Sequence, residues 1–302
     1  MHPAPSVILF TVLSGLGFGF LFFLNLGLIR PDGMAAIVAF GAGYGFAVAG
    51  LLASTFHLGN PQRALRAFTQ WRTSWLSREG WASVAALLAT APVAFTAAFG
   101  PAGLGLTGQE MAGGPLGLIA AALCLATIFC TSMIYAQLKT VPRWNHWTTP
   151  VLFMAFSAAG GSILAGLGSL SVLLCLTTGV AMIAAYALGD GRFATAGASL
   201  GTATGLGGLG DMRVFMPAHT AGNYVMREMI HVVGRKHARK LRFLSLSLGA
   251  VLPALVLAVL PASLVTMLLA LALHLTGAFA QRWLFFAEAE HVVSHYYGRD
   301  QT

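Results

Sequence analysis

Long stretches of apolar residues dominate the chain, and each is about the length needed to cross a lipid bilayer as a helix. A hydrocarbon core of about 30 Å needs about 20 residues at about 1.5 Å per residue. Eight such stretches follow one another, at residues 5–29, 34–57, 79–99, 116–137, 148–168, 169–188, 243–261 and 263–289. Short segments of alternating polarity, which build outer-membrane barrels, do not occur. The pattern predicts an all-α integral membrane protein with a bundle of about eight transmembrane helices.

The composition supports one membrane domain over residues 1–302. Hydrophobic residues make up 57% of the chain and charged residues only 9%, far from the balance of soluble domains. The three cysteines, Cys124, Cys130 and Cys175, lie inside apolar stretches and form no CxxC pair. The chain therefore has no cysteine framework for an iron–sulfur cluster or a zinc site, and we expect no metal in it.

The basic residues are concentrated in every second loop. The loop after the second stretch has Arg63, Arg66, Arg72 and Arg78, and the loop after the fourth has Lys139 and Arg143. The loop after the sixth has eight Lys and Arg residues, whereas the odd-numbered loops have Arg30 alone. By the positive-inside rule, the even loops and both termini are predicted to be cytoplasmic. The net charge of +8 reflects this bias, so we expect no nucleic-acid partner.

Residues 189–242 form a long basic loop with two different parts. Its first part is rich in Gly, Ala and Thr, a composition typical of flexible segments. Residues 223–242 combine spaced apolar residues with basic residues towards their end, which predicts an amphipathic helix on the membrane surface. Anchoring to lipid headgroups and docking of a partner protein are both open roles for this helix.

Three ionisable residues are predicted at the same depth, near the cytoplasmic face. His57 ends the second stretch, Glu79 begins the third, and Arg282 lies near the end of the eighth. Ionisable groups at membrane depth cost about 2.5 to 3.5 kcal/mol each by insertion scales, so each suggests a function. Quinone redox chemistry moves two electrons and two protons, and it needs hydrogen-bond partners for two ring oxygens. A histidine and a partly desolvated glutamate can exchange these protons, and Arg282 could hold Glu79 or polarise a quinone oxygen.

The loop between these residues supplies an apolar wall for a quinone ring, formed by Phe68, Trp71, Trp75 and Trp81. Its Gly59-Asn60-Pro61 sequence predicts a chain break followed by a short helix over about 61–70. Each charged residue also has a structural role available: His57 as a helix cap, Glu79 as a partner of the helix dipole and Arg282 as a snorkelling side chain.

Two segments carry a resemblance to a known family. "HLGNPQRALRAFTQWRTSWLSRE" resembles the loop between helices 2 and 3 of the membrane-anchor subunits of dimethyl sulfoxide reductase, with its His-Leu-Gly-x-Pro and Leu-Ser-x-Glu patterns. "YAQLKTVPRWNHWTTP" resembles the loop between helices 4 and 5 of that family, and "GAFAQRWLFF" resembles its last helix more weakly. The long basic sixth loop is more similar to the anchors of the related sulfite dehydrogenases.

The resemblance implies a three-subunit complex in a bacterial inner (cytoplasmic) membrane. It would comprise a molybdenum bis-guanine-dinucleotide catalytic subunit, an iron–sulfur subunit and this anchor, which would have no haem and would bind menaquinone or ubiquinone. His57 and Glu79 match the motif residues important to quinone binding in the family, and we expect Arg282, Trp75 and Trp71 beside them. The arginines Arg63, Arg66, Arg72, Arg78 and Arg143 would then dock the iron–sulfur subunit. Substrate chemistry would take place in the catalytic subunit, so this chain would have no catalytic residue.

Three alternatives remain open from the sequence. A haem cytochrome would need paired histidines at one depth, and only His274 lies well inside an apolar stretch. A membrane transporter would fit the Gly-rich stretches but not the lack of mid-membrane charges and paired broken helices. A structural anchor without a quinone site would fit the same loops and the same helices.

Overall fold

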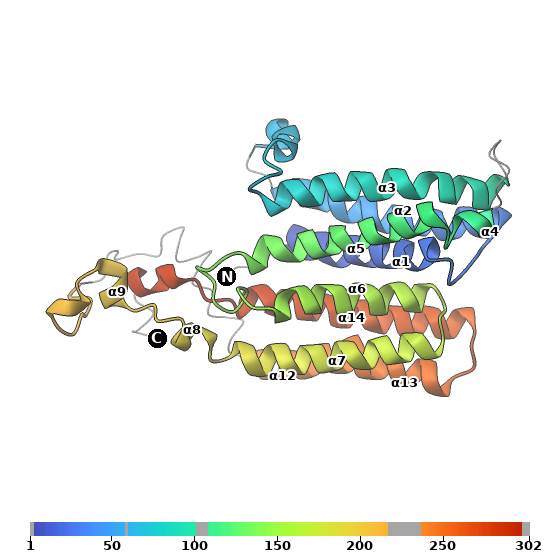
Figure 1. Cartoon of the computed structure of the whole chain (residues 1–302). Helices are drawn as coiled ribbons and strands as arrows, with labels where there is room; N and C mark the ends of the chain where they lie inside the picture. Colours follow the sequence, from blue (N-terminus) through green and yellow to red (C-terminus); the bar gives the residue numbers. More distant parts are fainter. Residues whose placement is uncertain (1–2, 58–59, 101–107, 217–236, 298–302) are drawn as a thin grey trace.

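The structure is a computed structural model that describes residues 3–57, 60–100, 108–216 and 237–297. Within these residues it is an all-α bundle, and eight helical segments lie side by side with roughly parallel axes (Figure 1). The segments are α1 (Pro5–Asn25), α2 (Gly33–Ala53), α3 (Trp75–Phe99), α5 (Pro115–Ala136), α6 (Thr148–Leu164), α7 (Ser169–Gly189), α12 to α13 (Ala238–Leu246 and Leu252–Val259, joined by the π-helix η4, Ser247–Val251) and α14 (Leu264–Ala287).

Seven of these segments are long and apolar enough to cross a membrane, and α6, with 17 residues, is a shorter apolar helix beside them. The prediction of an integral membrane bundle of about eight helices is therefore confirmed. The largest shift is at the seventh helix, which begins at Ala238 and not at 243. Arg242, inside this helix, pairs with acidic residues at the ends of α7 and α14.

The bundle consists of two four-helix groups (Figure 1). The first group contains α1, α2, α3 and α5, and the second contains α6, α7, α12 to α13 and α14. The groups meet mainly where α1 packs against α6 and α14 and where α5 packs against α6. The core therefore runs through α1, on which Phe18, Leu21 and Leu24 are almost fully buried.

Small residues let the central helices approach closely. A Cβ atom on Gly17 would collide with the backbone of Ala47 in α2, and one on Gly19 would collide with the carbonyl of Ser157 in α6. Such close backbone contacts are typical of membrane helices, whose association depends on packing because lipid is as apolar as the helices themselves. Both crossings therefore need glycine on α1.

One end of the bundle carries the even-numbered loops, the start of α1 and the end of α14, and we call it the basic end (Figure 1). It includes the short helices η1 (Ser54–His57), η2 (Pro61–Phe68), α8 (Arg192–Thr195), α9 (Leu200–Thr204), η3 (Gly207–Leu209) and η5 (Val292–Tyr297). The short helix expected after Pro61 is thus present, as a 3-10 helix. The opposite end carries α4 (Gly108–Met111).

The long sixth loop is described only in part. Its Gly-rich section contains α8, α9 and η3, and α9 begins with a reciprocal capping box between Ser199 and Thr202. Residues 217–236, which include most of the expected amphipathic helix, lie outside the described residues. The final residues of that expected helix, from Ala238, begin α12.

Candidate functional site

Glu79 is held inside the bundle by the first turns of α3. Ser74 caps this helix, and its hydroxyl accepts a hydrogen bond from the amide of Ser77. Glu79 lies on the next turn and is only 3% exposed. Its Oε1 accepts a hydrogen bond of 2.6 Å from the hydroxyl of Thr131 on α5. A carboxyl group is thus buried near the basic end, with a hydroxyl that can either donate to it or accept from it.

Aromatic side chains cover the α3–α5 contact beside Glu79. The ring of Trp75 meets the ring of Phe129 edge to face, with centroids 5.9 Å apart. The guanidinium of Arg78 lies 4.3 Å from the centre of the Trp75 ring. Arg78 also donates hydrogen bonds to the carbonyls of Trp71 (3.0 Å) and Arg72 (2.7 Å). Arg78 therefore fastens the loop before α3 to the helix itself.

The remaining arginines of this loop face outwards. Arg63, Arg66 and Arg72 are exposed, and within the described part of the chain none of them forms an ion pair. The η2 helix that carries two of them is attached to α3 by Phe68, whose ring packs on Trp81 and whose carbonyl accepts from the Trp81 indole at 2.9 Å. The loop that leads into the helix of Glu79 thus presents three exposed positive charges.

Arg282 lies inside the second helix group and not at the surface. It is 3% exposed, its guanidinium lies 3.6 Å from the centre of the Phe153 ring, and it donates one hydrogen bond of 3.2 Å to Gln281. Within the described residues, no carboxylate forms an ion pair with it. The ring faces of Phe153 and its neighbours compensate the charge only in part.

The structure brings some of the predicted site residues together and separates others. Glu79 and Arg282 both lie near the basic end, but they make no direct ion pair with each other. Trp75 lies one turn before Glu79, whereas Trp71 is 55% exposed on the loop. The side chain of His57 lies outside the described residues.

The segment between α5 and α6 folds into the bundle. Trp144 is 3% exposed, stacks on Phe285 with ring centroids 5.2 Å apart, and donates its indole N–H to the Phe285 carbonyl at 2.9 Å. Tyr135 packs edge to face on both of these rings. The second motif of the sequence therefore joins the end of α5 to the end of α14.

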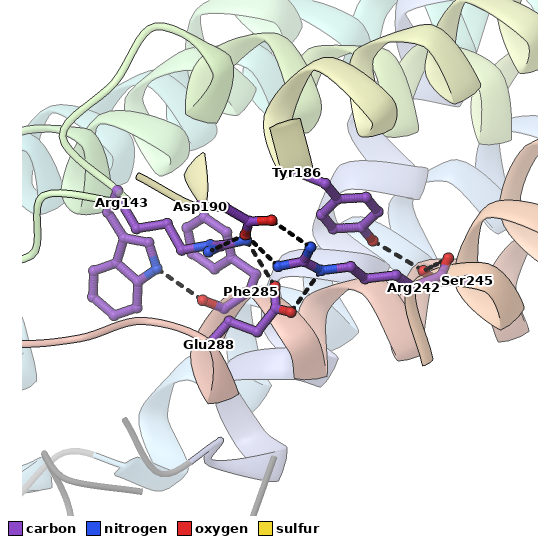
Figure 2. A network of polar contacts seen from close by, with 8 residues as sticks. Arg143, Tyr186, Asp190, Arg242, Ser245, Phe285 and Glu288 are labelled. Carbon is purple, nitrogen blue, oxygen red and sulfur yellow. Dashed lines mark hydrogen bonds and ion pairs between the residues drawn. The ribbon is translucent and has the colours of Figure 1, made fainter. Parts of the chain in front are cut away.

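A network of four charged side chains closes the second helix group at the basic end (Figure 2). Arg143 pairs with Asp190 (3.1 Å) and Glu288 (2.9 Å), and Arg242 pairs with the same two acids at 2.5 and 2.7 Å. Asp190 accepts hydrogen bonds from Arg242 and lies near the positive charge of Arg143, and both hold the pKa of its carboxyl below the usual range. Four segments distant in sequence are thereby joined at one point.

Sequence reasoning missed this network. Arg143 was expected to face a partner, and in the structure its guanidinium is occupied by Asp190 and Glu288. The signal available was the scarcity of acids: with nine Asp and Glu in the chain, acids that flank basic loops are strong candidates for pairing. Which arginine each would meet depends on the packing of the helices.

Fold and site together define a multi-pass membrane protein with a buried carboxyl near one end and exposed arginines on the adjoining loop. The family model for the DMSO reductase anchor subunit (DmsC) matches residues 1–288. The chain is 31% identical over 331 aligned residues to a sulfite dehydrogenase subunit of Allochromatium vinosum, covering 98% of this chain and 99% of that protein. No solved structure matches it. The chain belongs to the family of DMSO reductase anchor subunits.

Proposed function

We propose that this chain is the quinone-binding membrane anchor of a three-subunit molybdenum oxidoreductase of the sulfite dehydrogenase or dimethyl sulfoxide reductase type. It exchanges electrons between the quinone pool of a bacterial inner membrane and an iron–sulfur subunit, which connects it to the molybdenum catalytic subunit. The observation that carries this proposal is the burial of Glu79 on the Thr131 hydroxyl, at the end of a loop with exposed arginines. The basic end then faces the cytoplasm, where both partner subunits lie.

Each part of the site has a separate task in this function. Quinol oxidation releases two electrons and two protons, and quinone reduction consumes them. Glu79 accepts or returns one proton, while Thr131 orients its carboxyl. His57 serves the second ring oxygen. The aromatic rings of Trp75 and Phe129 form the apolar surface against which a quinone ring packs.

The loop arginines serve the protein partner. Arg63, Arg66 and Arg72 are exposed and can meet acidic side chains of the iron–sulfur subunit. Such a contact brings the nearest cluster of that subunit towards Glu79. Arg78 shapes this surface by holding the loop, through the Trp71 and Arg72 carbonyls. The family relationship with a sulfite dehydrogenase subunit supports a partner of this kind.

The experiment is quinol-dependent reduction of the purified three-subunit complex carrying Glu79→Gln or His57→Ala. We expect each variant to lower the rate by about 100-fold, the usual contribution of a positioned acid or base. Glu110→Gln is the matched control, because Glu110 lies exposed on α4 at the opposite end of the bundle. Unchanged rates in both site variants, with an intact complex, would identify the chain as a structural anchor without a quinone site.

A further inference from the structure

Two small cavities lie between Glu79 and Arg282, inside the contact of the two helix groups. The first, of about 10 Å³, is lined by Thr131 of α5, by Ser14 and Thr11 of α1 and by Ser157 of α6. The second, of about 20 Å³, is lined by the same Thr11 and Ser157 and by His274 and Arg282 of α14. About 10–15 Å³ is enough for one water molecule when polar partners surround it. Both cavities meet these conditions, the first at the lower limit.

The second cavity adjoins a charge that needs a solvent molecule. Arg282 has five N–H donors, but its side-chain hydrogen bond is to Gln281 alone within the described residues. A buried cation without hydrogen-bond acceptors costs several kcal/mol, and ring faces return about 2 kcal/mol of this. A water oxygen in the cavity supplies an acceptor to the free N–H groups.

The imidazole of His274 also indicates a water molecule in the second cavity. Its Nδ1 lies 2.7 Å from the carbonyl of Gly249 in the π-helix, and its Nε2 lies 3.3 Å from the carbonyl of Phe156. A neutral imidazole carries one proton, which belongs on Nδ1, where the contact is shorter. The lone pair on Nε2 then faces a carbonyl oxygen at the cavity wall, and it needs a donor that a water molecule provides.

We propose that each cavity holds an ordered water and that the waters complete a polar seam from Arg282 through Ser157, Thr11 and Thr131 to Glu79. Along the seam the donors point towards the carboxyl: Arg282 donates to the first water, that water to the Ser157 hydroxyl, Ser157 to the second water, the second water to Thr131, and Thr131 to Glu79. The Thr11 hydroxyl donates to the Val7 and Ile8 carbonyls of its own helix and accepts from the waters. Arg282 is thereby a positioning residue that stabilises the ionised form of Glu79 without touching it. Hydrogen bonds in a chain of this kind polarise one another.

The seam supplies the proposed quinone site with a counter-charge for Glu79 inside the bundle, and this step rests on the proposed function. A carboxylate that accepts a proton from quinol must first be held ionised in an apolar bundle. The counter-charge comes from the other helix group, across the α1–α6 contact. Proton transfer at Glu79 therefore depends on how the two groups pack.

The first test detects the waters and needs no quinone. X-ray hydroxyl-radical footprinting of the purified complex labels side chains beside bound water, and we expect Phe153 and Phe156, which line the cavities, to be labelled. Thr11→Val with Ser157→Ala removes the shared hydroxyls and should lower this labelling by about threefold or more. Thr96→Val with Ser162→Ala is the matched control, since these buried hydroxyls also bond to carbonyls of their own helices but line neither cavity. Absence of labelling at Phe153 and Phe156 in the unaltered protein would overturn the proposal.

The second test measures coupling through quinol-dependent reduction of the same complex. We expect Arg282→Gln to lower the rate by about tenfold, Arg282→Lys to lower it less, and Thr11→Val with Ser157→Ala to match Arg282→Gln. The variant that combines Arg282→Gln with Thr11→Val and Ser157→Ala should lose no more rate than either set alone, because both sets interrupt one seam. Rate losses that multiply in the combined variant would overturn the coupling. If Glu79→Gln leaves the rate unchanged, the quinone role is wrong, and the footprint still decides whether the seam is hydrated.

Discussion

Glu288 is the residue on which the ion-pair network of Figure 2 depends most. Its side chain is 5% exposed, whereas that of Asp190 is 52% exposed, although each pairs with both Arg143 and Arg242. Removal of a buried partner leaves its arginines desolvated and unpaired, whereas water can replace an exposed one. The two acids should therefore contribute unequally to stability.

We expect Glu288→Gln to destabilise the protein by about 2 kcal/mol and Asp190→Asn by less than about 1 kcal/mol. Thermal unfolding of the full chain in detergent can be followed with a thiol-reactive dye, because Cys124, Cys130 and Cys175 are all buried and free. Equal losses in the two variants would contradict the difference in solvent screening. Asp211→Asn, on the exposed sixth loop, is the control.

At the level of single residues, the sequence predicted the position of Glu79 along its helix but not the side chains around it. A glutamate at the start of an apolar stretch had to lie near a membrane face, and its helix begins where the Ser74 cap places it. Its partner, Thr131, is 52 positions away on another helix, and a threonine inside an apolar stretch has no feature that marks it as a partner. Arg282 was likewise expected near a membrane face, and only the packing of α6 on α14 shows it buried on Phe153.

At the level of helices, the contact of α1 with α6 holds the two helix groups together and depends on glycine. Gly19 of α1 meets the Ser157 carbonyl, and a Cβ on Gly161 of α6 would collide with the backbone of Gly19. Apolar stretches of about 20 residues reveal helices, but which face of each helix is in contact depends on shape, and lipid-facing and buried positions are equally apolar. The sequence therefore predicted the helices and not their arrangement.

Gly19→Leu should prevent α1 from packing on α6, so we expect little of this variant to survive solubilisation as a monodisperse protein. Gly45→Leu places the same side chain on α2, where nothing lies within 4 Å of the added Cβ, and should behave as the unaltered chain does. Size-exclusion chromatography with fluorescence detection compares the two directly. A normal profile for Gly19→Leu would mean that the α1–α6 contact differs from the one described.

For the whole molecule, the two helix groups have different surfaces at the basic end. The second group pairs Arg143 and Arg242 with Asp190 and Glu288, and it leaves Arg239 and Lys240 exposed on α12. The first group leaves Arg63, Arg66 and Arg72 exposed on the loop beside Glu79. Charges that are already paired add little attraction for a partner, whereas unpaired ones steer and orient it. Both groups have exposed cations, but those of the first group lie on the loop that leads into the helix of Glu79, so we expect the proposed iron–sulfur subunit to dock there.

Reversal of two of these free charges tests the assignment. We expect Arg63→Glu with Arg66→Glu to reduce co-purification of the partner subunits by at least about tenfold, because like charges then face each other across the contact. Arg63→Gln with Arg66→Gln should lose less, and its loss should grow with salt, since exposed charges are screened. The control is Arg30→Glu, on an exposed side chain at the opposite end of the bundle, and it should leave the complex intact. The η2 helix is attached to α3 through Phe68 and Trp81 and not through its arginines, so the Arg63→Glu and Arg66→Glu variant should fold normally. Full recovery of the complex with this variant would place the docking surface elsewhere.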